Sequence, residues 1–349
     1  MRFGYWMPVF GGWLRNVDDE GMEASWEYAS RLARRSEEIG FDLTLLAELF
    51  LNDIKGEDAP TLDAWSTAAA LAAVTKRLEL MVAVRPTFHS PTILAKQAAN
   101  IDRIANGRLS LNVVSSWWAT EAKKYGVQFD VHDDRYARTR EWLEVVDGAW
   151  REPRFSYQGK YYNVEEVILE PKPVSRPRPT IYAGGESPTA KELISGLCDG
   201  YLMHGDPADA IAPKVADMRE RRDRLGLPPM VYGAAGYVIC RDTEAEAQRE
   251  LERITDVRSG PAYENYQEWL SNTQLEKQVS LEDYSVSNRG LRSGLVGTPE
   301  QIADRLRDLE AAGLDLVLLQ FSPQLEEMER FAEQVIPLVN GTVPAANAA

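Results

Sequence analysis

The 349-residue sequence has few of the residues that build metal centres and disulfide frameworks. It contains two cysteines, Cys198 and Cys240, and three histidines, His89, His132 and His204. The cysteines lie far apart and no two histidines stand four residues apart, which argues against a zinc site and a disulfide scaffold. The motifs HExxH, CxxC and GxSxG are also absent, so metallohydrolase and serine-hydrolase chemistry have little support. We expect a reduced, cytoplasmic protein that binds no metal.

Long apolar runs and basic clusters are missing as well. No stretch reaches the roughly 18 apolar residues that a membrane-spanning helix needs, and the start, MRFGYWMPVF, shows no signal-peptide cleavage site. With 39 Lys and Arg against 54 Asp and Glu, the formal net charge is −15. Nucleic acids and anionic membranes need a basic face, so we expect neither as a partner. An anionic ligand would need a local pocket of arginines, backbone amides or a helix N-terminus.

Eight short apolar segments alternate with amphipathic helical patterns, which often begin at Ser or Thr and end at Gly. This alternation implies parallel strands joined by right-handed crossovers, and eight such units close a barrel. An open doubly wound sheet is the alternative, but no GxGxxG turn follows the first strand. We therefore predict an α/β protein with a (β/α)8, or TIM-barrel, fold. The predicted strands are Arg2–Met7, Leu43–Ala47, Leu78–Val84, Leu109–Val114, Thr180–Ala183, Gly200–Met203, Val231–Ile239 and Asp315–Phe321.

One barrel is expected to span residues 1–340, followed by a flexible tail at 341–349. Two connections within it are unusually long. Residues 115–179, after the fourth strand, contain a helical pattern, a strand pair and a Pro-rich segment. Residues 241–293, between the seventh and eighth strands, contain two helical patterns and then a polar segment without apolar periodicity. Long connections at the carboxyl face of a barrel often cover the active site, so the second insertion is predicted to carry a mobile active-site lid.

The fifth predicted strand leads into the sequence TIYAGGESPTAKELI. Two glycines, Gly184 and Gly185, precede a Ser-Pro pair that starts a helical pattern, which places bare backbone N–H groups at a helix N-terminus. That geometry can receive a phosphate, although an ordinary turn between strand and helix has the same sequence features. Glu186 would repel a phosphate unless its carboxylate points away from it.

Polar and aromatic residues also follow the fourth strand, in LSLNVVSSWWATE. Asn112, Ser115 and Ser116 can bond the edge of a heterocycle there. Trp117 and Trp118 come next, and because adjacent indoles cannot both face one core, at least one is expected to line a cleft or lie at a subunit contact.

Further candidates follow the third and sixth strands and lie in the insertions. His132 and Tyr136 are four residues apart and share one face if a helix starts there; the alternative is that Tyr136 packs inward. Arg85 and His204 either bind a ligand or have structural partners. In the predicted lid, Arg289 and Arg292 are either solvated or bring positive charge over a bound anion when the lid closes. We read Cys198 and Cys240 as core or strand residues.

Several stretches together carry a resemblance to a known family: RPTFHSPTILAKQAANIDRIANGRLSLNVVS, HDDRYARTREWL, YNVEEVILEPKPVSRPRPTIYAGGES, LVGTPEQIADRL and GLDLVLLQF. In these stretches the chain resembles the flavin-dependent two-component monooxygenases of the bacterial-luciferase-like superfamily, particularly dimethylsulfone and alkanesulfonate monooxygenases. The resemblance implies a barrel that binds FMNH2 from a separate NAD(P)H-dependent flavin reductase and uses O2 as cosubstrate. In such enzymes oxygen adds to the reduced ring, and the peroxide oxygenates a small organosulfur compound. It also implies a homo-oligomer, a dimer or a tetramer.

The resemblance assigns roles by position. It places Asn112 and Ser115 by the isoalloxazine, and His132 and Tyr136 by the ribityl chain and phosphate. The expected phosphate cup consists of Gly185, Glu186 and Ser187, with only the backbone of Glu186 inherited because many relatives have Ser there. The expected catalytic residues are His204, Arg289, Arg292 and Trp117.

The substrate residues of alkanesulfonate enzymes are mostly replaced. Ala235 and Tyr237 stand where those enzymes have Arg and His, and Ser322 and Gln324 stand where they have Tyr and His. Linear alkanesulfonates are therefore disfavoured, and in overall pattern the chain resembles the dimethylsulfone monooxygenases more. The expected substrate is a small organosulfur compound of the sulfone or sulfonate type. The SSWW segment is similar to one in relatives that cleave a pyrimidine ring or riboflavin, so a heterocycle remains an alternative substrate. Deazaflavin-dependent hydride transfer on the same fold and a non-enzymatic flavin-binding protein are two further alternatives.

Overall fold

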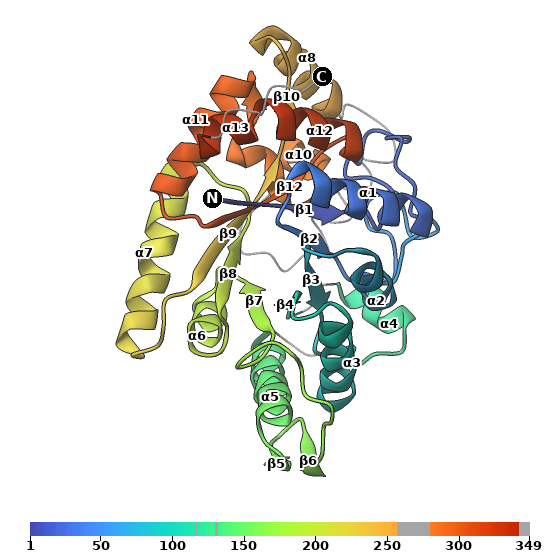
Figure 1. Cartoon of the computed structure of the whole chain (residues 1–349), viewed down its shortest axis with the longest axis vertical. Coiled ribbons are helices and arrows are strands. Elements are labelled where there is room, and N and C mark those ends of the chain that lie inside the picture. Colours follow the sequence, from blue (N-terminus) through green and yellow to red (C-terminus); the bar gives the residue numbers. More distant parts are fainter. Residues whose placement is uncertain (116–117, 130–131, 257–279, 342–349) are drawn as a thin grey trace.

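The computed structural model describes residues 1–115, 118–129, 132–256 and 280–341. Eight parallel strands close a barrel in the order β1-β12-β9-β8-β7-β4-β3-β2 (Figure 1). This confirms the predicted fold class, and every predicted strand has a counterpart whose ends lie within two residues of the expected ones. The strands are β1 (Arg2–Met7), β2 (Leu43–Leu46), β3 (Glu79–Val84), β4 (Leu109–Val113), β7 (Thr180–Gly184), β8 (Gly200–Met203), β9 (Val231–Tyr237) and β12 (Leu316–Gln320).

The seventh barrel strand is shorter than the predicted Val231–Ile239. β9 ends at Tyr237, and the next residues form β10 (Ile239–Cys240), which pairs with β11 (Val296–Gly297) outside the barrel. The reason is the length of the neighbouring strand. Because β12 stops at Gln320, whose carbonyl accepts from Val238 N at 3.0 Å, the chain must find another partner, and Ile239 N donates instead to Leu295 O at 2.9 Å.

Helices cover the outside of the barrel (Figure 1). Capping residues in the sequence mark the ends of several of them. In α1, Ser25 Oγ accepts from Tyr28 N, and Gly40 ends the helix in the left-handed region with φ 101°. A capping box of Thr298 and Gln301 starts α11. The helices that follow barrel strands are α1 (Trp26–Ile39), α2 (Ala64–Val74), α3 (Pro91–Ile104), α5 (His132–Arg151), α6 (Pro188–Leu197), α7 (Ala208–Arg224), α11 (Pro299–Ala311) and α12 (Gln324–Gln334).

Side chains fill the barrel interior, so it is a core and not a pore. A cluster separate from the main core contains Leu45, Met81, Tyr182, Leu202 and Leu318, which all project inward from different strands. The larger core lies between the strands and the helices. A packed interior leaves the carboxyl ends of the strands as the face on which a barrel of this kind builds its site.

The long connections form compact elements of their own. After α4 (Ala119–Lys124) and α5, the strands β5 (Phe155–Gln158) and β6 (Asn163–Val167) pair antiparallel, as the predicted strand pair requires. The hairpin lies next to α5, at the end of the molecule opposite α8 (Glu244–Thr255) (Figure 1). α13 (Ile336–Asn340) follows α12. Within the described ranges, no helix has both the length and the apolar character to cross a membrane.

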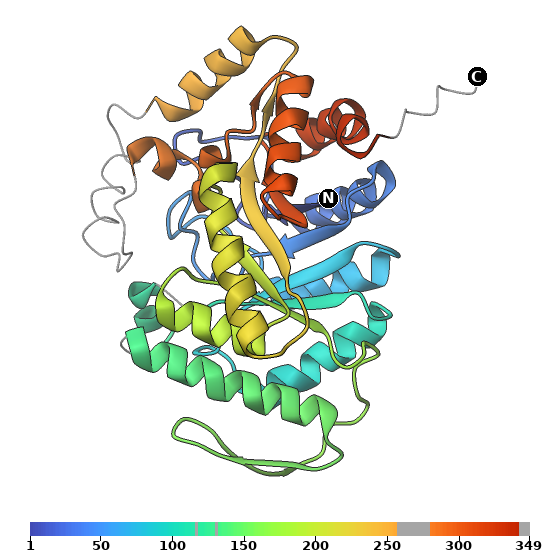
Figure 2. The same ribbon diagram turned by 90° about the vertical axis from the view of Figure 1, so that its left-hand side faces the viewer.

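The polar segment before β11 is ordered into short helices despite its lack of periodicity. It forms α10 (Leu281–Ser285) and the 3-10 helix η1 (Ser287–Ser293). Tyr284, Val286 and Leu291 are buried there, and Val286 forms an antiparallel bridge with Leu14. Figure 2 shows this orange segment on the same side of the barrel as the teal α4, which is the side of the strands' carboxyl ends.

Candidate active site at the barrel mouth

The turn after β7, which the sequence predicts to bind an anion, leads directly into the N-terminus of α6. Ser187 caps α6, with its Oγ accepting from Ala190 N at 3.2 Å. A Cβ added to Gly185 would lie 2.6 Å from Ala190 Cβ and 3.2 Å from Tyr136 Oη. Only glycine therefore lets the backbone pass this close to the helix and to Tyr136. The ten-residue helix α6 directs the positive end of its dipole at the turn.

A hydrogen bond from Tyr201 fixes the orientation of the Gly185–Glu186 peptide. Tyr201 Oη donates to Gly185 O at 3.0 Å, and burial raises the pKa of Tyr201, so the phenol stays protonated and keeps donating. In a trans peptide the carbonyl and the next N–H point in opposite directions. The Glu186 N–H is therefore turned away from Tyr201.

The Glu186 carboxylate is compensated by a lysine from the next helix. Lys214, on α7, forms an ion pair with Glu186 and a second one with Asp206 at 2.7 Å. Burial works to lower the pKa of Lys214, but the hydrogen bonds to Asp206 and Glu186 outweigh it and raise that pKa above its ordinary value. The repulsion of a phosphate that Glu186 would cause is thus offset by a permanently charged neighbour.

Asn112 points into the upper part of the barrel. It lies in register with Tyr182 of β7, which belongs to the interior cluster, and residues in register on parallel strands share a face. Its side chain is buried, with 7% exposure. Ser115, three residues further on, has its Oγ 3.1 Å from Thr139 Oγ1 on α5, so it ties the end of β4 to the helix that carries Tyr136. Trp118 is half-buried and precedes α4.

A buried ionic cluster at the ends of β2 and β3 was not foreseen from the sequence. Arg85 lies against Glu48, with its backbone N 2.9 Å from Glu48 Oε2, and its guanidinium pairs with Glu121 of α4. The other oxygen of Glu48 is 2.6 Å from His89 Nε2. Glu121 also accepts from Phe50 N at 2.6 Å. The open alternative for Arg85 is thereby decided in favour of carboxylate partners.

This cluster, which comprises Glu48, Arg85, His89 and Glu121, is almost entirely out of water. Arg85 is 2% exposed and Glu121 is fully buried. The guanidinium carbon also lies 4.0 Å from the Phe88 ring centroid, a cation–π contact. The cluster joins α4, which directly follows the Trp117–Trp118 pair, to the strands at the mouth. Two sequence signals pointed to it: Glu48 directly after an apolar strand, and Arg85, for which structural partners were one of the two alternatives.

The remaining predicted residues are distributed as follows. His204 directly follows β8, two residues after the inward-facing Leu202. Alternate residues of an extended segment point to the same face. Arg292, in η1, forms an ion pair with Asp206 at 2.8 Å. Arg289 lies in the same 3-10 helix and His132 begins α5, but their side chains are outside the described atoms. Trp117 and Ser116 lie outside the described residues.

Two positions that carry substrate groups in the alkanesulfonate enzymes have structural roles here. Gln324 is fully buried, and its Oε1 accepts from Trp13 Nε1 at 2.7 Å and from Phe321 N at 3.2 Å. Tyr237, at the end of β9, is 1% exposed. A Cβ on Gly290 of η1 would lie 2.8 Å from Tyr237 N, so η1 sits directly on this strand end. Neither position offers a positive charge.

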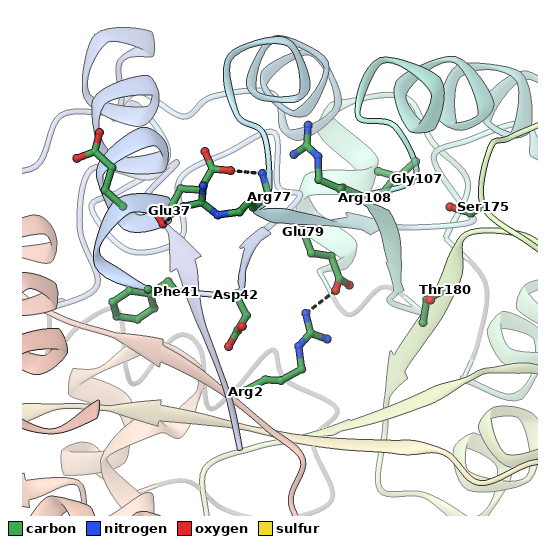
Figure 3. Close-up of a pocket in the computed structure, with 13 residues that line it drawn as sticks. Arg2, Glu37, Phe41, Asp42, Arg77, Glu79, Gly107, Arg108, Ser175 and Thr180 are labelled. Carbon is green, nitrogen blue, oxygen red and sulfur yellow. Dashed lines mark hydrogen bonds and ion pairs between the residues drawn. The ribbon is translucent and has the colours of Figure 1, made fainter. Parts of the chain in front are cut away.

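A cavity of about 560 Å³ lies at the other face of the barrel, where the strands begin (Figure 3). Charged pairs line it: Arg2 binds Glu79 at 2.7 Å, and Glu37 accepts from the backbone N–H groups of the segment before β3. The amino ends of barrel strands contribute stability and not catalysis, and these charges already have partners. We therefore assign the cavity no part in the active site. Among the residues that the structure describes, no group of three or more His, Cys, Asp or Glu is placed to hold a metal.

The fold and this turn define a TIM-barrel protein whose mouth carries a capped helix N-terminus directly after a pair of glycines. Residues 1–316 match the family model described as luciferase-like monooxygenase, and the chain belongs to that family. This confirms the resemblance noted in the sequence.

The chain is similar to FMNH2-dependent dimethylsulfone monooxygenases. It is 33% identical to that of Pseudomonas putida, covering 97% of this chain and 95% of the relative. It is 32% identical to that of Pseudomonas fluorescens (strain Pf0-1), covering 97% and 94%.

Solved structures share the fold at lower identity. A riboflavin lyase has a TM-score of 0.83 at 22% identity, with 99% of this chain and 92% of that chain covered. An EDTA monooxygenase from Chelativorans sp. BNC1 has a TM-score of 0.80 at 22% identity, with 100% and 96% covered. At this identity the likeness supports the barrel fold alone.

Proposed function

We propose that the protein is a monooxygenase that takes reduced FMN from a separate flavin reductase and oxygenates a small organosulfur compound of the sulfone type. The observation that carries the proposal is the turn at Gly185, where the backbone passes against Tyr136 and the N-terminus of α6. The similarity to dimethylsulfone monooxygenases over nearly the whole chain supports the substrate class.

The residues at the mouth fit a phosphorylated, flat cofactor. Gly184 to Ser187 and the Tyr136 hydroxyl would hold the phosphate, because they combine backbone amides, a helix dipole and a phenol. Asn112 would bond the edge of the ring from inside the barrel. Bound reduced flavin supplies the electrons with which dioxygen is activated.

The chain's own contribution is to bind, orient and exclude water. The filled interior below Asn112 closes the site from the opposite face of the barrel. The ionic cluster around Arg85 and the packed η1 hold the rim in place. Keeping water from a reactive site favours transfer to substrate over decay.

A neutral substrate suits the β9 and β12 side of the mouth better than an anion does. Ala235 and Tyr237 carry no charge, and Gln324 is engaged with Trp13. A sulfonate would need cationic donors there, whereas a sulfone brings two oxygens without a net charge. This supports the sulfone class over linear sulfonates.

The test is a product screen with the purified chain, FMN, NADH, a generic flavin reductase and 18O2. Sulfones, alkanesulfonates, a pyrimidine and riboflavin are offered separately and the products read by mass spectrometry. We expect 18O in a product from a sulfone, only when the reductase is present. If 18O appeared only in a product of riboflavin or of the pyrimidine, the substrate would be a heterocycle and not a sulfone. Anaerobic turnover with reduced deazaflavin, or tight binding of oxidised FMN without any product, would refute the oxygenase.

A substitution at Tyr136 tests the cofactor site separately. Tyr136→Phe should weaken binding of reduced FMN by about 1 kcal/mol, the contribution of one hydrogen bond. The matched control is Tyr157→Phe, since that hydroxyl donates to Glu144 at 2.7 Å on the β5 hairpin, away from the mouth. Equal affinities of the two variants would remove Tyr136 from the site.

A further inference from the structure

Four charged side chains from four separate segments form one continuous series of ion pairs beside the β7–α6 turn. Glu186 in the turn pairs with Lys214 of α7, and Lys214 pairs with Asp206 of the β8–α7 loop at 2.7 Å. Asp206 pairs through its other oxygen with Arg292 of η1 at 2.8 Å. We call these four residues the mouth ion-pair series.

Burial is greatest in the middle of the mouth ion-pair series. The side chain of Asp206 is 8% exposed and that of Lys214 is 16% exposed, against 29% for Glu186 and 40% for Arg292. Charges that are withdrawn from water are screened less by solvent and salt. The Lys214 charge therefore acts on its surroundings more strongly than a surface lysine would.

The signs along the series make Lys214 decisive for an anion at the turn. With Lys214 present, Glu186 and Asp206 are balanced by Lys214 and Arg292. Without it, two carboxylates would be left with one cation, and one of them, Glu186, belongs to the turn itself. A phosphate at the α6 N-terminus would then meet uncompensated negative charge.

We propose that Lys214 is the residue that lets this turn accept a phosphate monoester, and that it thereby selects phosphorylated over unphosphorylated flavin. The inference rests on the proposed function, since it names what sets cofactor choice at that site. Asp206, held from its other side by Arg292, is the positioning residue that keeps the Lys214 ammonium beside Glu186. This explains how a glutamate is tolerated in a phosphate cup.

The experiment compares binding of reduced FMN and reduced riboflavin, titrated anaerobically and followed by flavin fluorescence, in the parent and in Lys214→Met. One unscreened unit charge near the phosphate corresponds to at least about a tenfold change in affinity. We expect Lys214→Met to weaken the binding of reduced FMN by that factor. The affinity for reduced riboflavin should stay within about twofold, because its ribityl chain ends in a neutral hydroxyl.

The chain offers a matched control. Lys191 of α6 pairs with Asp217 of α7 at 2.8 Å, and its side chain is 18% exposed, close to the 16% of Lys214. Lys191→Met removes the same charge from the same helix pair but not from the mouth ion-pair series. It should leave the preference for FMN over riboflavin unchanged.

Two further variants keep the test decisive if Lys214→Met folds poorly. Lys214→Arg retains the charge and should retain the preference for FMN. Glu186→Gln combined with Lys214→Met removes the charge at the turn that Lys214 compensates, and should recover part of the lost FMN affinity.

The outcomes separate the two levels of the argument. Two results would overturn the role of Lys214 while leaving the proposed function intact. One is an equal loss of affinity for reduced FMN and reduced riboflavin in Lys214→Met, and the other is an equal change in the preference for FMN in Lys214→Met and Lys191→Met. Failure of the parent to bind reduced flavin at all would refute the proposed function and the inference together.

Discussion

The buried ion pair between Arg85 and Glu121 gives a prediction whose size follows from its surroundings. Glu121 is fully buried, it pairs with a guanidinium that is 2% exposed, and it accepts from Phe50 N at 2.6 Å. Glu121→Gln keeps the shape and an acceptor oxygen but removes the charge. Breaking a buried pair by neutralising one partner costs about 3 kcal/mol or more. We expect the free energy of unfolding to fall by that amount.

A second ion pair of α4, with a different partner segment, serves as the control. Lys124 of α4 pairs with Glu57 of the β2–α2 connection, but these side chains are 47% and 42% exposed. Exposed pairs contribute only about 0–1 kcal/mol. Glu57→Gln should therefore change the urea midpoint little, although it also removes an ion pair of α4.

The assay is urea unfolding followed by tryptophan fluorescence, with the slope compared as well as the midpoint. An unchanged slope means that the same surface is exposed on unfolding. The double variant Arg85→Met/Glu121→Met should lose less than the sum of its single variants, because each single variant takes a partner from the remaining charge of this pair and the double variant removes both charges. A loss for Glu121→Gln no larger than that for Glu57→Gln would refute the reasoning, as would full additivity.

Three other predictions concern separate parts of the molecule. Gly185→Ala should abolish measurable binding of reduced FMN and lower stability by about 1–3 kcal/mol, since the new methyl would lie 2.6 Å from Ala190 Cβ; equilibrium dialysis with unchanged affinity would contradict this. Burial works to raise the pKa of Glu37, but three backbone N–H donors outweigh it and hold that pKa below its ordinary 4.5. The carboxylate therefore stabilises the fold above pH 4.5, and this stabilisation is lost as the pH falls through the depressed folded pKa. Glu37→Gln should accordingly be less stable than the parent in urea at pH 7, with the difference shrinking below pH 4.5; a constant difference would show that the carboxylate charge is not responsible. Burial raises the pKa of Cys198 to about 12 and that of Cys240 to about 11, so neither thiol should react with a disulfide reagent at pH 8 until urea unfolds the chain, and rapid labelling of the folded protein would contradict this.

Much of the architecture was predictable because it is written in local patterns. Apolar runs of strand length alternate with helices capped at Ser25 and Thr298, and this alone implies parallel pairing and a closed barrel. The glycine pair before Ser187 likewise marked the turn between β7 and α6. These features depend on residues within one or two turns of each other, so the chain reveals them without tertiary contacts.

The end of β9 was not predictable, because it depends on where β12 stops. The sequence from Val231 to Ile239 is uniformly compatible with a strand. Only in the folded barrel does Val238 meet the last carbonyl of β12, after which Ile239 turns to Leu295. The helices within 281–293 were hidden for a similar reason, since Val286 and Leu291 are buried against other segments and not along one helix face.

By itself the sequence determined the barrel, the family and the position of the glycine turn before α6, because periodicity, caps and glycines act over short distances. Only the tertiary structure decided how the charges at the mouth are paired. Arg85 and Glu121 are 36 residues apart and Glu186 and Lys214 are 28 apart. Which carboxylate meets which cation depends on how strands and helices are laid side by side when the barrel closes, and a linear pattern of charges does not contain that information.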